Sequence, residues 1–325
     1  MANGFDMLRK FLILGGTGFV GRSVCETLVE RSGGADGRLR IATRRFPRAR
    51  HLQLLPTVEI ACADIHDEGN LARLLRDTDA VINLAAILHG SEAEFERVHV
   101  RLPARLAAAC KAAGVRRMVH VSALGAALDA PSRYQRSKAR GEDVLKAAGL
   151  DLTILRPSVI FGERDRFLNL FASLQSIFPV LPLAGAGARF QPVWVDDVAS
   201  AIVRTIDDPT TIGMTIECCG PRVYTLAELA RAAGEWSGSS RPVLALPALL
   251  GRLQALFMEM LPGTPLMSRD NIDSMRVANV ASGKMPGLER LGLEPSPLEA
   301  IAPRYLGHVS GEKRLEFWRS KARRI

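Results

Sequence analysis

Apolar positions along the first half of the chain follow two alternating patterns. Short, continuous apolar runs such as residues 11–15 and 80–85 are typical of strands that are buried on both faces. The predicted strands cover residues 11–15, 40–43, 58–63, 80–85, 117–122 and 152–155. The segments between them have helical spacing, and the predicted helices cover residues 18–30, 67–75, 93–113 and 132–148. Alternation without hairpin signals predicts a doubly wound, mostly parallel α/β sheet.

Beyond residue 156 the alternation weakens, because prolines interrupt the segments. They are Pro179, Pro182, Pro192, Pro209, Pro221, Pro242 and Pro247. We expect a main domain over residues 8–162 and a small mixed C-terminal cap domain over residues 163–310. Residues 190–220 are expected to return in part to the main domain, and residues 311–325 to form a tail.

Composition supports a globular protein and excludes several classes. Of the 325 residues, 47% are hydrophobic and 24% are charged. The longest apolar runs are far shorter than the ~18–20 residues of a membrane-spanning helix, and residues 1–8 lack the apolar core of a secretion signal. The five cysteines are odd in number and form no C-x-x-C pair, and the six histidines show no ligand spacing. A cytoplasmic protein without a metal site is therefore expected.

The most informative motif is the glycine loop at residues 15–21. It reads Gly15, Gly16, Thr17, Gly18, Phe19, Val20 and Gly21, directly after a strand and at the start of a helix. Glycines there permit a tight turn, let a pyrophosphate approach the backbone and let the helix pack closely on the strand. Because free N–H groups of the helix N-terminus face the same place, the loop predicts a dinucleotide site.

The residues after the second strand bear on which dinucleotide is bound. NAD-binding sites carry an acidic residue ~20 positions beyond the loop, which contacts the ribose 2′-hydroxyl. This chain has Arg44 and Arg45 there and no acid. Guanidinium groups suit a 2′-phosphate, so NADP(H) is favoured, with NAD(H) as the alternative. The competing interpretation is that both are ordinary surface arginines of an arginine-rich chain.

Two further strand ends are candidate cofactor contacts. Asp64 and Ile65 follow the third strand, where a carboxylate could meet the adenine amino group; Asp64 could equally cap the next helix. Leu84, Ala85 and Ala86 follow the fourth strand, and small side chains there let the backbone pass close to a cofactor. The alternative for this second set is plain core packing.

The candidate catalytic residues are Ser122, Tyr134 and Lys138. Ser122 ends the fifth strand, and Tyr134 and Lys138 lie one turn apart on the next helix. An ammonium beside a phenol stabilises the phenolate, so we expect Lys138 to lower the pKa of Tyr134. Tyr134 would then be a general acid or base, with Ser122 orienting the substrate oxygen. The alternative is that Tyr134 only lines the pocket and Lys138 only holds the ribose.

Together these residues resemble the extended or atypical short-chain dehydrogenase/reductase superfamily, whose domain is a Rossmann fold. The resemblance rests on GGTGFVG, on NLAA at residues 83–86, on the strand-end serine, on YQRSK at residues 134–138 and on RPSVIFG at residues 156–162. It implies that Pro157 and Val159 also line the cofactor site. A segment at residues 191–199, QPVWVDDVA, resembles the same superfamily where its chain enters the cap. Residues 265–273 and 279–280 are similar to bacterial relatives of the nucleotide-binding accessory subunit of complex I.

The resemblance implies three candidate functions. The first is hydride transfer between NADP(H) and a carbonyl or alcohol of an apolar, quinone-related or isoprenoid substrate. The second is a non-catalytic NADPH-holding accessory or assembly protein of respiratory complex I or of ubiquinone biosynthesis. The third is a nucleotide-sugar epimerase or dehydratase, which the missing acid at residues 41–45 argues against. The intact Tyr134 and Lys138 favour the enzyme.

Two C-terminal segments concern partners. Residues 247–261 carry a broad apolar stripe, which predicts an internal packing helix, a cover for an apolar substrate or a contact with a membrane surface. The net charge is +9, and the segment from Arg304 onward contains seven Lys or Arg but only two acidic residues, Glu312 and Glu316. The basic, amphipathic residues 311–325 predict either a solvated terminal helix or a peripheral contact with a membrane or a respiratory complex. Because only 6% of residues are aromatic and the charge is terminal, no nucleic-acid partner is expected.

Overall fold

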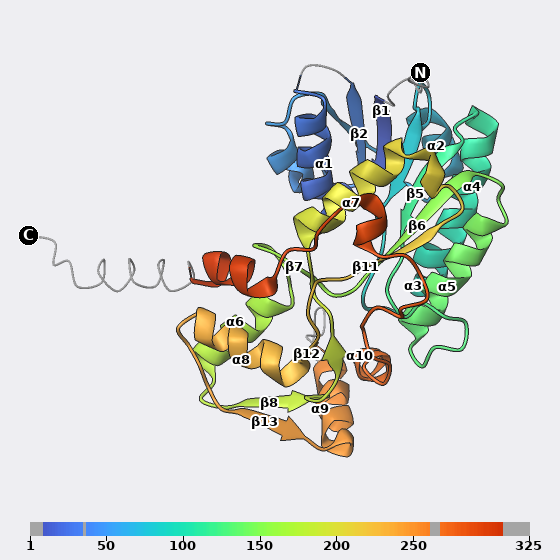
Figure 1. Ribbon diagram of the computed structural model, residues 1–325. Helices are drawn as coiled ribbons and strands as arrows, with labels where there is room; N and C mark the ends of the chain where they lie inside the picture. Colours follow the sequence, from blue (N-terminus) through green and yellow to red (C-terminus); the bar gives the residue numbers. More distant parts are fainter. Residues whose placement is uncertain (1–8, 35–36, 261–266, 308–325) are drawn as a thin grey trace, which may run out of the picture. The chain divides into compact units, whose positions relative to one another are not determined.

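The computed structural model describes residues 9–34, 37–260 and 267–307 (Figure 1). The chain divides into two units. The first unit comprises Met1–Pro157, Val195–Cys218 and Ala281–Glu294, and the second comprises Ser158–Trp194, Cys219–Val280 and Pro295–Ile325. The predicted tail over residues 311–325, the segment 1–8 and residues 265–266 of the complex I-like motif lie outside the described residues.

The first unit is built on a seven-stranded parallel sheet. Its strands are β1 (Lys10–Leu14), β2 (Arg38–Thr43), β3 (Val58–Cys62), β4 (Ala80–Asn83), β5 (Arg117–Val121), β6 (Asp151–Pro157) and β11 (Thr215–Cys218). The spatial order β11-β6-β5-β4-β1-β2-β3 reverses direction between β1 and β4. This confirms the predicted doubly wound Rossmann-type sheet and places its topological switch point beside the glycine loop.

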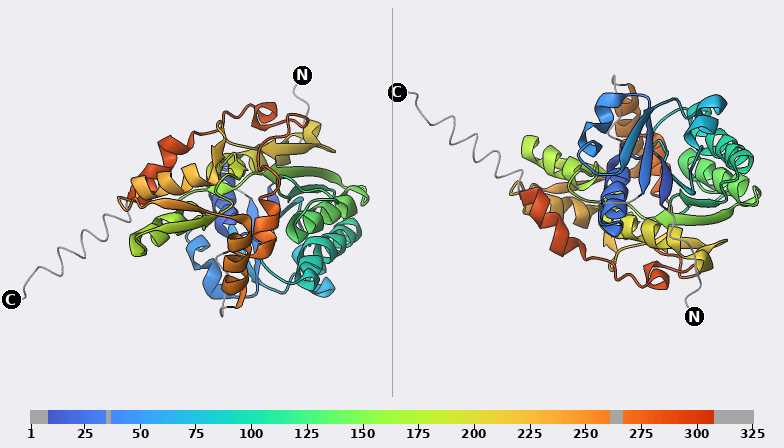
Figure 2. Two further views of the ribbon diagram at one scale, coloured as in Figure 1. Left: turned by 90° about the horizontal axis from the view of Figure 1, so that it is seen from below. Right: turned by 90° about the horizontal axis from the view of Figure 1, so that it is seen from above.

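Helices cover both faces of this sheet (Figure 2). The main ones are α1 (Phe19–Arg31), α2 (Glu68–Leu74), α4 (Leu102–Ala113), α5 (Arg133–Lys146) and α7 (Val195–Asp207); shorter ones are η1 (Phe46–Leu52), α3 (Glu92–Phe95), η3 (Pro209–Thr211) and η4 (Leu288–Leu291). Helices α1 and α7 pack against each other on one face, and α2, α4 and α5 lie on the other. Buried leucines such as Leu12, Leu71 and Leu106 join the sheet to the second layer of helices.

The predicted helix over residues 93–113 is interrupted. After α3 the chain makes a π-helical turn, η2 (Glu96–Arg101), before α4 begins. Pro103 has no N–H to donate to the carbonyl of His99, so a regular helix cannot continue through this point. The carbonyl of His99 faces Gly141 of α5, where a β-carbon would lie only 2.0 Å from the carbonyl oxygen.

Residues 190–220 are split between the two units. Most of residues 193–206 is helical and belongs to the first unit, because α7 begins at Val195 and packs on α1. Only Val193 and Trp194 are extended, as β10, and they pair with β7 (Ile160–Phe161) in the second unit. The segment 214–220 does supply a strand of the main sheet, since β11 pairs in parallel with β6.

The second unit is a smaller, mixed α/β body. Besides β7 and β10 it contains α6 (Leu168–Ile177), β8 (Leu181–Ala184), β9 (Arg189–Phe190), β12 (Tyr224–Thr225), α8 (Leu226–Trp236), β13 (Val243–Leu246), α9 (Ala248–Met260) and α10 (Arg269–Ser274). Its strands form three two-stranded pairs. The core lies between α6 and α8, around Leu168, Phe171, Leu229 and Leu306.

The interpretation of residues 247–261 as an internal packing helix is wrong. The segment forms α9, but this helix buries only Gly251 and Ala255. No helix among the described residues is both long enough and apolar enough to cross a bilayer.

A buried arginine joins the end of α7 to the sheet of the first unit. Arg117, at the start of β5, donates to the carbonyl oxygens of Ile206 at 3.2 Å and of Thr205, which end α7. It also donates to the carbonyl of Asp151 at 2.7 Å and to Thr153 Oγ1 at 3.0 Å in β6. Burial lowers its pKa to about 10, so the side chain stays charged at neutral pH.

We expect Arg117→Met to destabilise the protein. The substitution leaves helix-end carbonyls buried without a donor, which costs about 3 kcal/mol or more of unfolding free energy. Urea unfolding followed by circular dichroism measures the loss. Arg116→Met is the matched control, because the neighbouring Arg116 is exposed and bonds Asp151 at the surface; equal effects of the two substitutions would contradict a structural role for Arg117.

Candidate active site

The glycine loop connects β1 to α1 at the carboxyl edge of the first unit's sheet. Gly15 has a φ of +82°, and a β-carbon on it would lie 2.9 Å from the backbone carbon of Leu84. A β-carbon on Gly21 would lie 2.5 Å from the carbonyl oxygen of Gly15. Gly18 donates its N–H to that same oxygen at 2.9 Å and precedes α1 without a side-chain cap. The loop therefore forms a backbone-lined cradle in front of the α1 N-terminus.

Residues 84–86 run beside this cradle. The N–H of Leu84 donates to the carbonyl of Leu14 at 2.8 Å, which holds the end of β4 next to β1. The N–H of Ala85 donates to Asn83 Oδ1 at 3.2 Å, and Ala86 is exposed. These predicted contact residues lie at the switch point of the sheet, where doubly wound folds bind ligands.

Arg44 and Arg45 follow the end of β2, the strand next to β1. Both side chains are exposed, and neither forms an ion pair with a carboxylate in the described part of the chain. The N–H of Arg45 is tied to Thr43 Oγ1 at 3.2 Å, so the backbone at this corner is fixed while the guanidinium groups face solvent. The positive charge of Arg44 is one of the causes that lower the pKa of His66, although burial is the largest.

Asp64 and Ile65 lie after β3, one strand further from β1. Asp64 is exposed and accepts the N–H of His66 at 3.0 Å. The cap of α2 is Asp67, which accepts the N–H of Asn70 at 2.7 Å. The alternative in which Asp64 caps this helix is therefore wrong. Within the described residues, only one carboxylate oxygen of Asp64, the one that accepts from His66, bonds to the backbone.

Ser122 lies directly after β5, the neighbour of β4. Its N–H donates to the carbonyl of Leu155 at 2.8 Å, which fixes the backbone to β6. Its Oγ is buried and has no hydrogen-bond partner among the described residues. A buried hydroxyl without a partner is rare in folded proteins and points to a partner that binds there.

Tyr134 and Lys138 lie one turn apart on α5, which begins after the Ser132 cap. Lys138 is 2% exposed, and its ammonium donates to the carbonyl of Val121 at 2.8 Å, next to Ser122. Burial lowers the pKa of Lys138 to about 8, against an opposing contribution from Glu142. The lysine therefore remains mostly protonated at pH 7.

The prediction that Lys138 lowers the pKa of Tyr134 is wrong for the protein without a bound cofactor. Burial raises the pKa of Tyr134 to about 12. The ring packs edge-on against Phe95 and His99, with centroids 6.2 Å and 5.6 Å away. Desolvation of the phenolate therefore outweighs the attraction of Lys138, and Tyr134 is a protonated phenol at neutral pH.

Two buried histidines belong to the same site and were not predicted. His99, on the π-helical turn, accepts the N–H of Ile87 at Nε2, 3.1 Å away, so Nδ1 carries its proton and donates to Ser137 Oγ at 2.8 Å. Ser137 in turn donates to the carbonyl of Tyr134 at 2.7 Å. His99 therefore joins the loop after β4 to the first turn of α5. The sequence signal that could have marked it is Pro103 four residues later, inside a predicted helix.

The second histidine, His120, is in β5. Its Nδ1 lies 3.1 Å from Asn83 Nδ2 in β4, and the Asn83 side chain also holds the N–H of Ala85. Burial is the main cause that lowers the pKa of both histidines, with a smaller contribution from Lys138; the value for His99 is about 3, and His120 lies well below its ordinary range. Both rings are neutral at pH 7 beside a charged lysine.

Pro157 and Val159, the last two predicted cofactor residues, are in different units. Pro157 ends β6 in the first unit, and its carbonyl accepts the N–H of Leu124 at 2.9 Å. Val159 is in the second unit, where its N–H donates to Asn279 Oδ1 at 2.9 Å. Ser158 bonds the same asparagine oxygen at 2.6 Å.

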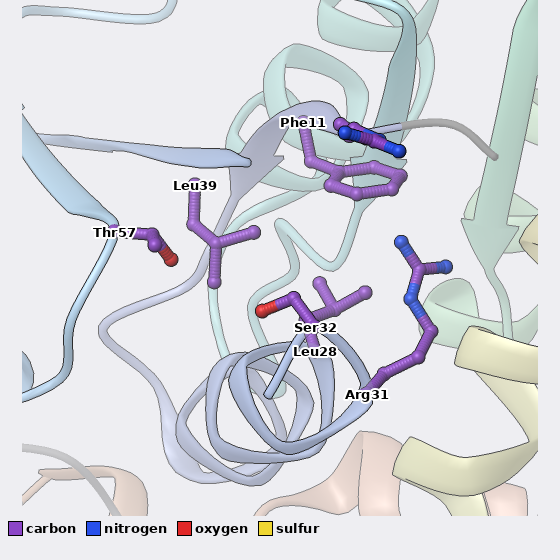
Figure 3. Close-up of a pocket in the computed structure, with 7 residues that line it drawn as sticks. Phe11, Leu28, Arg31, Ser32, Leu39 and Thr57 are labelled. Atoms are coloured by element: carbon purple, nitrogen blue, oxygen red, sulfur yellow. The ribbon is translucent and has the colours of Figure 1, made fainter. Parts of the chain in front are cut away.

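A small cavity lies at the opposite edge of the sheet, away from these residues (Figure 3). It measures about 170 Å³ and is lined by the starts of β1 and β2 and the end of α1. Figure 3 shows the Arg31 guanidinium facing the Phe11 ring, 5.1 Å from its centroid. Since it lies at the amino ends of the strands, this cavity is separate from the candidate active site.

The residues at the carboxyl edge fit a dinucleotide. The cradle has no room for β-carbons, the α1 N-terminus is uncapped, and the arginines after β2 face solvent without an ion pair in the described chain. Ser122 Oγ supplies a buried hydroxyl without a partner in the described chain, and Tyr134 supplies a protonated phenol. The arrangement can bind a phosphate-bearing cofactor and can donate a proton to a substrate oxygen.

Comparison with known proteins gives a consistent result. The sequence matches the model of the NAD dependent epimerase/dehydratase family over residues 11–219. It is 32% identical over 294 residues to NADH dehydrogenase (ubiquinone) 1 alpha subcomplex subunit 9, mitochondrial, of Mus musculus, covering 88% of this chain and 77% of that protein. It is 32% identical over 238 residues to the ceramide reductase of Caulobacter vibrioides, covering 72% of this chain and 73% of that protein.

Solved structures share the fold. The NADPH-dependent quinone oxidoreductase of Escherichia coli, solved with NADPH, has a TM-score of 0.73 at 20% identity, covering 92% of this chain and 99% of that one. The dTDP-glucose 4,6-dehydratase of Streptomyces venezuelae, solved with NAD, has a TM-score of 0.71 at 24% identity, covering 91% and 95%.

The two buried histidines predict loss of stability in acid. The unfolded chain protonates them below about pH 6.5, whereas folded His99 takes up its proton only near pH 3 and folded His120 well below its ordinary range. The unfolding free energy should therefore fall as the pH falls from about 6.5 toward 3, by about 1.4 kcal/mol per pH unit for each such histidine. Urea unfolding between pH 7 and pH 4 measures the slope.

The variant His99→Gln should reduce this slope by about 1.4 kcal/mol per pH unit, the contribution of one histidine. An unchanged slope in His99→Gln would show that His99 is not held neutral in the folded state.

Proposed function

The chain belongs to the NAD dependent epimerase/dehydratase family, and we propose that it is a reductase that uses NADP(H) to reduce an oxo group on an apolar, lipid-like substrate. The observation that carries the proposal is the set of groups at the end of β5 and on the first turns of α5. A buried hydroxyl without a partner in the described chain, a protonated phenol and a buried ammonium come from the end of β5 and one turn of α5. This set matches what a carbonyl oxygen needs as it becomes an alcohol.

The cofactor residues follow from the fit of the site. The backbone cradle at Gly15 and Gly18 and the α1 N-terminus would hold the pyrophosphate. Arg44 and Arg45 would contact a ribose 2′-phosphate, and Asp64 would lie near the adenine. A bound nicotinamide dinucleotide supplies the hydride. Lys138 would hold the nicotinamide ribose, because its ammonium lies beside the strand end that carries Ser122.

The protonation states favour reduction over oxidation. Reduction adds a hydride to the carbonyl carbon and a proton to the oxygen. Tyr134, with a pKa of about 12, carries that proton at neutral pH and can deliver it from its hydroxyl. Ser122 Oγ would donate a hydrogen bond to the same oxygen. The charge of Lys138 would stabilise the phenolate left on Tyr134, which solvent then reprotonates.

The substrate class is proposed from the relatives and from the candidate site. A ceramide reductase, by its name, acts on a lipid, and it is 32% identical to this chain over a stretch that includes most of it. Arginines stand after β2 where an acid would suit NAD, which argues against an NAD-dependent nucleotide-sugar epimerase.

A second candidate function is an accessory protein that holds NADPH without turnover. The similarity to a mitochondrial complex I subunit over 88% of this chain favours it. In that case the protein would work at a respiratory or quinone-synthesising complex at the inner face of the membrane. The retained Tyr134 and Lys138 favour the enzyme, since an accessory protein needs neither a proton donor nor a serine without a partner.

Tyr134→Phe should abolish turnover and spare cofactor binding. Loss of the phenolic proton donor should lower kcat by about 100-fold or more, while the Kd for NADPH changes little. The measurement is NADPH oxidation with long-chain ketones and a short-chain quinone analogue, beside NADPH fluorescence titration. Tyr224→Phe, in the second unit, is the control. Turnover that survives in Tyr134→Phe would exclude Tyr134 as the proton donor, and tight NADPH binding without turnover in the unsubstituted protein would favour the accessory function.

The double variant Arg44→Ser/Arg45→Ser should weaken NADPH binding by at least about tenfold, because charge-assisted hydrogen bonds to the 2′-phosphate are lost. NADH binding should stay within about twofold, since NADH has no such phosphate. Isothermal titration with both cofactors measures this difference. Arg48→Ser removes an exposed arginine of η1 and serves as control. A parallel loss of NADH affinity would show that the arginines do not recognise the 2′-phosphate.

A further inference from the structure

Helix α9 of the second unit has its small residues inside and its large apolar residues outside. Gly251 and Ala255 are buried, and a β-carbon on Gly251 would lie 2.7 Å from the β-carbon of Ala184 in β8. The side chains opposite them are large and exposed: Leu249 is 73%, Leu250 51%, Leu253 54%, Leu256 38%, Phe257 65% and Met260 78% exposed. We call these six residues the α9 ridge.

This orientation is costly for a helix that has only water beside it. Six large apolar side chains on one helix form a continuous patch, of the kind that marks an interaction site on a folded protein. Burying Leu253 or Phe257 instead of Gly251 and Ala255 would have stabilised the fold more, since each large apolar side chain contributes about 1.5–3 kcal/mol when fully buried.

The charged residues of α9 are held away from the ridge. Arg252 bonds Asp273 at 2.8 Å, and Glu259 bonds Arg269 at 2.8 Å, both on α10. They are the two charged side chains of α9. The ridge itself therefore contains no charged side chain. Other apolar side chains of the same unit are also exposed, among them Phe178 and Val180 after α6 and Leu244 in β13.

We propose that the α9 ridge docks on an anionic lipid bilayer. The helix is about 20 Å long and would lie in the plane of the interface, with Leu249, Leu253, Phe257 and their neighbours inserted below the headgroups. The charge of the protein complements such a surface. Residues 308–325 of the same unit contain six Lys or Arg and two Glu, and the whole chain carries a net charge of +9.

A bilayer suits the ridge better than a second copy of the chain. A stable protein interface buries about 800 Å² per partner with complementary polar groups at its rim. The ridge is one helix face of flexible aliphatic side chains and one phenylalanine, and the two charged side chains of its helix are already paired with α10. A fluid acyl layer accommodates such a shape without complementarity, and basic residues add about 1 kcal/mol each near an anionic surface. The proposal does not depend on catalysis.

The test is binding of the full-length protein to vesicles of phosphatidylcholine with and without phosphatidylglycerol, measured by sedimentation. The variant Leu249→Ser/Leu253→Ser/Phe257→Ser should reduce the partition coefficient by at least tenfold. Because these side chains are exposed, far-UV circular dichroism and the unfolding midpoint should stay the same. The control Leu54→Ser/Leu128→Ser alters two exposed leucines of the first unit and should bind within twofold of the unsubstituted protein.

Ionic strength separates the two contributions. For the unsubstituted protein, 0.5 M NaCl should weaken binding to anionic vesicles, since charge attraction is screened and apolar insertion is not. Vesicle binding that is equal in the triple variant and the unsubstituted protein would overturn the proposal. So would light scattering that shows an oligomer which the triple variant dissociates while its vesicle binding persists, because the ridge would then bind a second copy.

Discussion

The structure of the site depends on one steric constraint, the absence of side chains where three backbone segments meet. The turn at Gly15 touches the backbone of Leu84, and Gly21 brings α1 against the same turn. Any β-carbon there would lie within 2.9 Å of backbone atoms, a contact that folded proteins do not contain. This close approach aligns the α1 N-terminus with the ends of β1 and β4, so a phosphate can be bound by N–H groups alone. The remaining site residues are placed by neighbouring strands of the same parallel sheet.

A second close approach positions helix α5, which carries the candidate catalytic residues. Gly141 lets α5 come against the carbonyl of His99, whose α-helical donor is missing because residue 103 is a proline. The imidazole of His99 then bonds both Ser137 and the loop after β4. Helix α5 is thus held at two points, and the ammonium of Lys138 donates to the carbonyl of Val121, next to Ser122. The π-helical turn thus contributes both a carbonyl that faces Gly141 and the imidazole that bonds Ser137.

The sequence was sufficient for the parts of the site that depend on local pattern. The glycine loop, the strand ends at Arg44, Asp64 and Ser122, and the one-turn spacing of the helix residues all follow from short-range periodicity. Properties that depend on tertiary surroundings were missed or misjudged. His120 has no sequence signal, because a single histidine in an apolar strand has many uses, and His99 is marked only indirectly, by Pro103 inside a predicted helix. The spacing of Tyr134 and Lys138 predicts a lowered pKa for Tyr134, whereas burial of the ring, which packs on Phe95 and His99, raises it.

Helix α9 shows the same limit in another form. Periodicity predicts that a helix has an apolar stripe. It does not predict that the opposite side, which carries small residues, will be the one packed against the protein. In α9 the deciding feature is β8, where Ala184 leaves no room for a β-carbon on Gly251, so the small residues Gly251 and Ala255 are the buried ones. The large residues are then on the outside, and an exposed apolar patch of this kind marks an interaction site. Reduction of a lipid-like substrate and docking on a bilayer are separate proposals, but docking would give the reductase access to its substrate. An apolar substrate dissolves in the membrane, and an enzyme bound there by an uncharged ridge encounters it at a far higher local concentration than in water.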